Sequence, residues 1–111
     1  MKVTSTENVE SAEVLDGVNL AQLVVGDQMN IQHFEIQPDV YVEEHEHQEQ
    51  AGFIFSGELL WVVDGEEHLT EAGDTYIIPG DTLHSAENTG DEPAVGIELF
   101  SPPRPNPPWA E

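Results

Sequence analysis

Two histidines lie one residue apart in an otherwise acidic and amide-rich stretch, EEHEHQEQAGF, which begins at Glu43 and ends at Phe53. On an extended strand, residues i and i+2 point to the same face, so we expect His45 and His47 to project together. Two neighbouring imidazoles suit a divalent metal ion, because a neutral ring nitrogen is a common metal ligand. For this stretch alone, the alternative is a chance pair of solvated histidines in a charged loop.

A metal site needs further ligands from other strands. Gln50, just across an expected tight turn, is one candidate, and His84, which follows a Pro-Gly turn, is another. Glu43 and Glu49 are rivals, because either carboxylate could replace one of the other ligands. The preferred set is His45, His47, Gln50 and His84. Imidazole and amide ligands suit Zn, Fe, Mn, Ni and Cu, so the sequence predicts one divalent ion without identifying it.

A second group of chemically capable residues lies in the stretch ELFSPPR, residues 98–104. Glu98 and Phe100 are two positions apart, so on a strand they share a face. Arg104 is the only arginine of the chain. Its guanidinium group is either a structural partner for nearby carboxylates or a clamp for an anionic substrate.

The elements that must position these residues are predicted to be strands. Short runs rich in β-branched and aromatic residues alternate with Gly, Pro, Asp and Asn, and no segment has a convincing period of 3.6. The connections are too short for crossover helices, so antiparallel pairing in a single-domain sandwich or barrel is expected. The predicted strands are Val18–Val25, Met29–Ile36, Val40–His47, Gln50–Phe55, Glu58–Val63, Glu67–Thr70, Thr75–Ile78, His84–Asn88 and Ala94–Phe100.

Three segments are expected along the chain. Residues 1–15 form an N-terminal arm, either as a frayed turn or as an added edge strand. Residues 16–101 form the barrel. Residues 102–111 form a proline-rich tail that packs on the barrel, with Trp109 as its anchor.

Composition narrows the function classes. The chain has 111 residues, no cysteine, and 23 acidic against two basic residues, for a formal net charge of −21. Such a surface repels nucleic-acid phosphates and anionic lipids, so neither is an expected partner. No long apolar run or secretory signal is visible, and a cytoplasmic location is expected. We interpret the charge as that of a protein from a salt-loving organism; an ordinary acidic protein is the alternative.

The stretch GDTYIIPGDTLHSAEN, residues 73–88, resembles the second signature motif of the cupin superfamily. That motif places a glycine, a proline, a histidine and an asparagine at set spacings, which are occupied here by Gly73, Pro79, His84 and Asn88. Asp81 stands where a further glycine is usual, and aspartate tolerates a left-handed turn better than most residues. The resemblance implies a small antiparallel β-barrel of jelly-roll type.

The HxH stretch is similar to the first cupin motif. In that motif an acidic or amide residue follows the HxH pair, and a glycine comes seven residues later, as Gln50 and Gly57 do here. Only two residues separate His47 from Gln50, which is shorter than usual. The resemblance covers residues 29–104 and implies bound metal, a small-molecule substrate and, as is common in this fold class, a homodimer.

Within the superfamily, ELFSPPR resembles the end of small cupins that act in pectin and alginate breakdown. Those proteins convert an unsaturated uronate ring into a linear keto-sugar acid, and they also have a glutamine in the first motif. Their aspartate, phenylalanine and arginine beside the metal correspond to Glu98, Phe100 and Arg104, with one extra methylene at Glu98. The resemblance implies that Phe100 and Arg104 bind the substrate and that Glu98 and Arg104 take part in catalysis.

The predicted function is therefore a metal-dependent ring opening or tautomerisation of a small oxygenated organic acid such as an unsaturated uronate. Three-histidine cupin sites that hold iron can also bind dioxygen, so an Fe-dependent dioxygenase is an alternative. A non-catalytic binding or sensing protein is the third interpretation.

Overall fold

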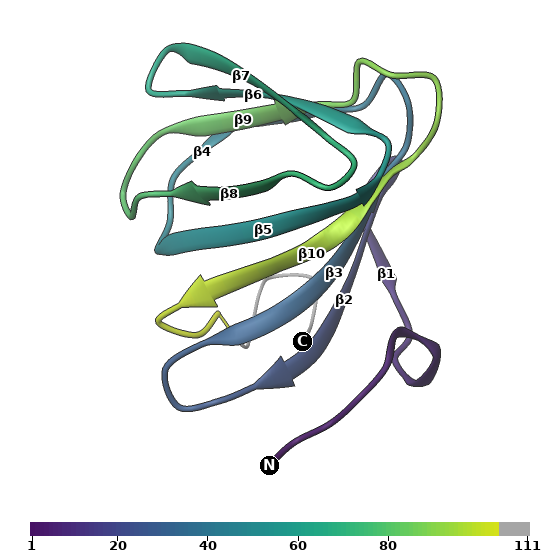
Figure 1. Ribbon diagram of the computed structural model, residues 1–111, viewed down its shortest axis with the longest axis vertical. Helices are drawn as coiled ribbons and strands as arrows, with labels where there is room; N and C mark the ends of the chain where they lie inside the picture. The colour runs from purple at the N-terminus through teal and green to yellow at the C-terminus, as the bar shows by residue number, and fades with distance from the viewer. Residues whose placement is uncertain (105–111) are drawn as a thin grey trace.

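The structure is a computed structural model that describes residues 1–104, in which ten strands form two facing antiparallel sheets (Figure 1). This is the predicted single-domain jelly-roll barrel. Trp109 and the rest of the tail beyond Arg104 lie outside the described residues. Among residues 1–104 the only helix is one 3₁₀ turn, Thr6–Asn8, and no helix is long and apolar enough to cross a bilayer.

The strand order differs from the sequence order in both sheets. The six-stranded sheet contains, in spatial order, β1 (Ala12–Leu15), β2 (Val18–Val25), β3 (Asn30–Ile36), β10 (Ala94–Ser101), β5 (Glu49–Ser56) and β8 (Thr75–Ile78). The four-stranded sheet contains β4 (Tyr41–His45), β9 (His84–Glu87), β6 (Glu58–Val63) and β7 (Glu66–Glu71).

Alternating side chains create the core between the sheets. Along β3 every second residue is buried, including Phe34 and Ile36, because successive side chains on a strand point to opposite faces. These residues pack with Ile54 on β5 and with Leu59 and Trp61 on β6. The indole Nε1 of Trp61 donates a 3.0 Å hydrogen bond to Thr70 Oγ1, so this buried polar group has a partner.

Turn chemistry follows the sequence closely. Asp64 and Gly65 join β6 to β7 with φ values of 49° and 82°, as expected for the two-residue hairpin that an Asp-Gly pair favours. Asp81 has a φ of 57°, so it adopts the left-handed conformation expected where the cupin motif has a glycine. Asn88 is fully buried directly after β9. Its Nδ2 donates to the carbonyl oxygens of Ile36 and Glu92, which connects the end of β9 to the end of β3 and to the loop before β10.

Two segments differ from the predicted strands by more than a one-residue shift of an end. The strand predicted over Val40–His47 ends at His45, so His47 lies in the connection to β5 and not on the same strand. The last part of the predicted arm is β1, which pairs with β2 at the edge of the six-stranded sheet. Of the two alternatives for the arm, the added edge strand is therefore the one formed by Ala12–Leu15.

Salt should stabilise this fold. Within residues 1–104 the only ion-pair contact is His68 with Glu66, and no carboxylate has a Lys or Arg partner within 4.0 Å. Raising KCl from 0.1 to 1 M shortens the Debye length from about 10 to 3 Å, which screens the repulsion between the carboxylates. We expect the melting temperature to rise by at least about 5 °C, equivalent to about 1 kcal/mol. Thermal melts at both salt concentrations test this, and a lower melting temperature at high salt would contradict it.

Candidate metal centre and cavity

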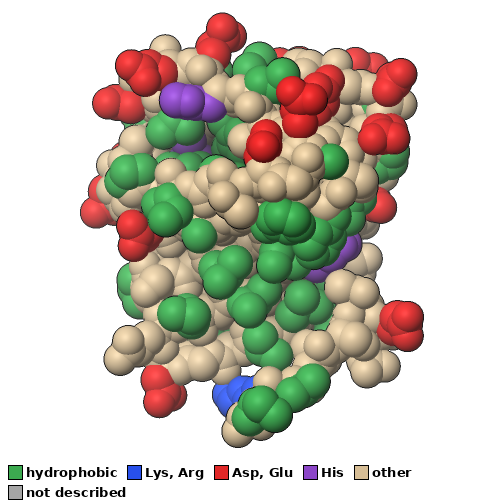
Figure 2. Space-filling view, in the orientation of Figure 1, with side chains coloured by type: hydrophobic (Ala, Val, Ile, Leu, Met, Phe, Trp, Pro, Cys, Tyr) green, Lys and Arg blue, Asp and Glu red, His purple; other side chains and the backbone are tan. Residues whose placement is uncertain are grey.

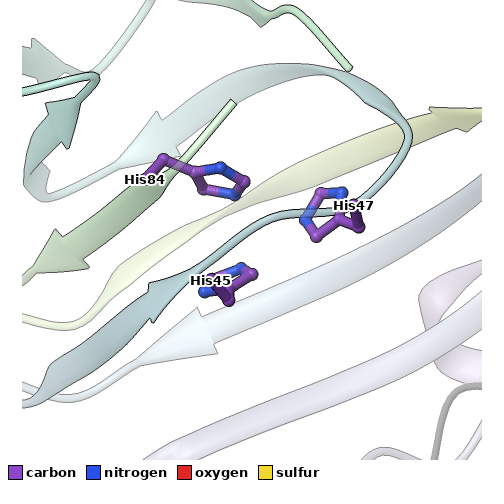
Figure 3. A group of neighbouring side chains, drawn as sticks. All are labelled: His45, His47 and His84. Atoms are coloured by element: carbon purple, nitrogen blue, oxygen red, sulfur yellow. The ribbon is translucent and has the colours of Figure 1, made fainter. Parts of the chain in front are cut away.

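Three histidines from two segments far apart in the sequence face a common point between the sheets (Figure 3). His45 is the last residue of β4, and it lies directly opposite His84, the first residue of β9. His47 follows in the connection to β5, where the chain turns back toward the cavity. One ring nitrogen from each histidine can be chosen so that all three lie within 4.8 Å of one another. The structure thus brings together the three predicted histidines.

Hydrogen bonds to the backbone orient all three rings. The Nδ1 atoms of His45, His47 and His84 lie 2.7, 2.8 and 2.9 Å from the carbonyl oxygens of Glu43, Gln48 and Thr82. A carbonyl oxygen only accepts, so each Nδ1 must carry the hydrogen. This tautomer leaves the lone pair of each Nε2 unprotonated, which is the form that binds a metal ion.

His84 Nε2 is a buried nitrogen without a hydrogen-bond partner among the described residues. The side chain is only 1% exposed, and an unsatisfied buried polar atom is costly. A metal ion at the centre of the three rings would give this atom a partner. The donor set therefore fits a divalent ion.

Burial favours the neutral form of two of the imidazoles, those of His47 and His84. Desolvation lowers the pKa of His47 to about 4, although its hydrogen bond to Gln48 opposes the shift. Burial likewise lowers the pKa of His84, again against a hydrogen bond to the backbone. Protons therefore compete weakly with a metal for these nitrogens near neutral pH.

Gln50 and Glu98 lie on neighbouring strands of the opposite sheet and are linked to each other. Gln50 Nε2 donates to Glu98 Oε1 at 3.0 Å, and Gln32 Nε2 donates to Glu98 Oε2 at 2.6 Å. The amide nitrogen of Gln50 is thus engaged with Glu98, which leaves its amide oxygen as the atom that an ion could take. Glu98 opens onto the internal cavity, and its desolvation there raises the pKa of the carboxyl group, with Gln32, Arg104 and Gln50 opposing the rise.

Tyr76 completes this network from β8. Its hydroxyl lies 3.5 Å from Gln50 Nε2, and its ring packs over Gly52, where an added Cβ would lie 2.2 Å from Tyr76 Cζ. Gly52 is therefore required by a close approach of the tyrosine ring. Burial, together with the nearby Glu98, raises the pKa of the Tyr76 hydroxyl, so this group stays protonated.

Phe100 and Arg104 flank the histidines. The Phe100 ring lies edge-on to the His47 ring with centroids 5.2 Å apart, and Arg104 Cζ lies 5.5 Å from the Phe100 centroid. The backbone of Arg104 is held by Asn30 Oδ1 and by Gln22 Nε2. Within residues 1–104 its guanidinium group makes no ion pair, so no described carboxylate neutralises it.

These side chains line one cavity of about 410 Å³ between the two sheets. The cavity wall is polar toward one end of the strands and apolar toward the other. On the paired strands β3 and β10, Gln32 lies beside Glu98 at the polar end, and Phe34 lies beside Gly96 at the apolar end. The polar part holds the three histidines, Gln32, Gln50, Glu98 and Arg104, and the remaining wall is apolar. A ligand with one anionic end and one less polar face matches this lining.

The rival ligands lie elsewhere. Glu43 and Glu49 are exposed residues of β4 and β5, and neither belongs to the histidine cluster or lines the cavity. Gln32 and Tyr76, by contrast, were not singled out by sequence reasoning. Each lies at one of the alternate positions of its strand that face the interior. This alternation is the only sequence signal that could have pointed to them.

Acid should destabilise the metal-free protein through these histidines. The folded pKa of His47 lies below its ordinary value of 6.5, so between 6.5 and about 4 the unfolded chain binds more protons. The stability that this group supports is complete above pH 6.5 and is lost as the pH falls toward 4. After allowance for screening at a half-buried site, we expect about 1 kcal/mol, or about 4 °C in melting temperature.

Melts in EDTA and 1 M KCl at pH 7 and pH 5 measure this loss. The variant His47→Gln should lose less stability between the two pH values than the wild type. The variant His68→Gln, at an exposed strand residue, should behave like the wild type. An equal loss of stability between pH 7 and pH 5 in His47→Gln and in the wild type would contradict the prediction.

Comparison with known proteins agrees with this architecture. The Cupin domain family matches residues 32–100. The structure is similar to that of KdgF from Halomonas sp., with a TM-score of 0.86 and 20% identity over 94% of this chain and 96% of that one. It is also similar to an RmlC-like cupin from Shewanella frigidimarina, with a TM-score of 0.82 and 22% identity over 91% and 90% of the two chains.

A predicted oxalate decarboxylase from Thermotoga maritima is similar as well, with a TM-score of 0.77 and 20% identity over 90% of this chain and 98% of that one. At these identities the likeness concerns the fold. The family match, however, spans both histidine-bearing stretches, including His45, His47 and His84. With its two-sheet barrel and inward-facing histidines, this chain belongs to the cupin family.

Proposed function

We propose that this protein is a metal-dependent enzyme that opens or tautomerises a small organic acid, with a 4,5-unsaturated uronate as the leading substrate. One observation carries the proposal: the three-histidine cluster, the desolvated carboxyl of Glu98 and the guanidinium of Arg104, which makes no ion pair within residues 1–104, line the same cavity. The resemblance of ELFSPPR to the uronate-linearising cupins supports the choice of substrate.

His45, His47 and His84 would hold the ion, with the amide oxygen of Gln50 as a fourth ligand. Because these four ligands are neutral, a bound divalent ion keeps its charge and supplies Lewis-acid polarisation of a substrate oxygen.

The other residues bind the substrate and move protons. The Arg104 guanidinium can hold the substrate carboxylate, because such pairs form parallel hydrogen bonds. Phe100 offers an apolar edge to the sugar ring, which has no hydroxyl at its unsaturated carbons. Glu98 has a desolvated carboxyl group, and Gln32 and Gln50 hold it in place, so it is suited to accept and return a proton within the cavity.

The reaction is a balanced isomerisation. The ring-form hydroxyl at the anomeric carbon loses its proton, and the bond from that carbon to the ring oxygen breaks to leave an aldehyde and an enolate. The enolate then takes a proton at carbon and becomes a ketone. The proton lost in the first step equals the one gained in the last, so a single carboxyl group can serve both steps without a co-reactant.

Loss of the ultraviolet absorbance of a 4,5-unsaturated uronate tests the proposal. Metal-loaded protein should accelerate the loss well above the spontaneous rate, and protein treated with chelator should not. A rate equal to the spontaneous one, with Zn, Fe, Mn, Ni and Cu each loaded in turn, would contradict the proposal.

The apolar wall favours a second candidate. Val18, Leu20, Phe34 and Trp61 line the cavity and offer no hydrogen bonds to hydroxyl groups, which suits an acid with a hydrocarbon part. With Fe(II) in the three-histidine site, such an acid could be oxidised by dioxygen. Oxygen uptake that depends on both Fe(II) and a branched or aromatic acid would select this candidate. Tight binding of the acid without turnover would select a binding protein.

A further inference from the structure

The cavity extends well beyond its polar end. On β3 its lining runs from Gln32, beside Glu98, to Ile36, opposite Val18. Four residues of a strand at about 3.3 Å each span about 13 Å. One sugar ring is shorter than this distance, so an acid that binds at Arg104 with a single ring leaves the far end of the cavity open.

The far end of the cavity, the apolar end, is lined by hydrophobic side chains from both sheets. Its residues include Val14, Leu20, Phe34, Ile36, Val42 and Trp61. Trp61 is the one member of this set with a polar side-chain group, and its Nε1 already donates to Thr70 Oγ1. These six side chains therefore offer no hydrogen bond to a sugar hydroxyl group.

Part of the apolar end remains open to a ligand. Val14, Leu20 and Val42 pack against the core but are only partly buried, and all three line the cavity. Water finds no hydrogen-bonding partner on such a wall, and side chains around an empty space lose packing contacts. A hydrocarbon group that enters this space is removed from water and restores those contacts. The apolar end therefore suits the hydrocarbon part of a ligand.

The opposite end of the ligand should be an acid group. Among the described residues that line the cavity, Arg104 is the only Lys or Arg, and its guanidinium makes no ion pair within residues 1–104. A guanidinium group holds a carboxylate by two parallel hydrogen bonds. The cavity thus fits one molecule with a carboxylate at one end and a hydrocarbon chain at the other.

We propose that the cavity binds a medium-chain carboxylic acid, with its carboxylate at Arg104 and its chain in the apolar end. The inference rests on the carboxylate anchor of the proposed function, and it names the class of acid for the second candidate. If a uronate is the substrate, the same acid competes with it for Arg104. Binding tests this inference and turnover tests the proposed function, so the two can fail separately.

Calorimetric titration of the wild-type protein with butyrate, hexanoate, octanoate and decanoate measures the binding. Figure 2 shows carboxylates around the edges of the molecule, and the net charge is −21, so 1 M KCl is needed to screen the repulsion of an anionic ligand. Each added methylene should lower the Kd about fourfold until the chain fills the apolar end.

Suberate gives a matched comparison that needs no variant. It has the length of octanoate but carries a second carboxylate, which would be buried in the apolar end without a partner. Its Kd should exceed that of octanoate by at least about 10-fold.

Two variants locate the chain. Leu20→Phe fills open space in the apolar end, so it should reduce the preference for octanoate over butyrate by at least about 10-fold. Hydrophobic side chains are also exposed on the outer surface (Figure 2), and a chain could adsorb there. Ile77→Gln is the control for such adsorption, because Ile77 is 69% exposed and does not line the cavity. This control should keep the wild-type preference.

Three results would each overturn the inference. They are a Kd that does not depend on chain length, a suberate Kd equal to that of octanoate, and an octanoate preference that Ile77→Gln lowers as much as Leu20→Phe does. If Leu20→Phe does not fold, the comparison of octanoate with suberate in the wild type still decides. Octanoate binding as expected, together with no uronate turnover, would refute the uronate proposal and support this inference.

Discussion

Replacing His84 with alanine should lower the metal affinity of this protein by at least about 100-fold. The ring of His84 is buried, its Nδ1 is held by the Thr82 carbonyl oxygen, and its Nε2 has no partner among the described residues. It is therefore pre-oriented to act as a metal ligand. Removing it leaves His45 and His47 as the only imidazoles of the site, and the pair alone cannot enclose an ion.

Elemental analysis after reloading with one metal measures the effect, and a thermal shift gives an independent measurement. A metal that binds only the folded state raises the melting temperature of the wild type, and this rise should be absent in His84→Ala. His68→Ala is the matched control, because His68 is an exposed residue of β7 outside the cluster. Equal metal content in wild type and His84→Ala would show that the cluster is not the binding site.

Replacing Glu98 with glutamine should lower kcat toward an unsaturated uronate by about 10²- to 10⁴-fold, the usual contribution of a positioned acid–base group. The substitution keeps the size of the side chain, so the packing against Gln32 and Gln50 is largely preserved. It removes the capacity to accept a proton. Metal content should stay at the wild-type level, because the three histidines are untouched.

Glu71→Gln is the control for the lost charge, since Glu71 is exposed on β7 and does not line the cavity. It should leave kcat unchanged. Full activity of Glu98→Gln would contradict the proton-transfer role. A loss of metal in Glu98→Gln would instead show that Glu98 acts by positioning Gln50, and it would equally overturn that role.

Much of the fold could be predicted because its signals are local. The strands are predicted from alternating apolar and polar side chains and from the Gly, Pro and Asp residues that separate the runs. Two of the strands, Glu58–Val63 and Thr75–Ile78, have the same bounds in prediction and structure. The Asp64-Gly65 hairpin depends only on the dihedral preferences of those two residues. The end of β4 was missed by two residues, because the turn that carries His47 is stabilised by a backbone contact from Asp81 to the His47 carbonyl oxygen.

The candidate site was predictable only where a motif marks it. The motifs point to seven residues, and all seven line one cavity: His45, His47, Gln50, His84, Glu98, Phe100 and Arg104. No motif points to Gln32 or Tyr76, since a buried polar residue on a strand has no local signature. Their importance arises from the register that sets Gln32 beside Glu98 and from the close approach of Tyr76 to Gly52.

The sequence by itself determined the strand content, the acidic surface and which residue types could bind a metal, because each of these depends on composition or on neighbours along the chain. Only the tertiary structure decided that His84 faces His45, that Glu98 lies inside while Leu99 lies outside, and that one end of the cavity is apolar. These features depend on register between strands distant in sequence, and a shift of one residue would turn every side chain of a strand to the opposite face.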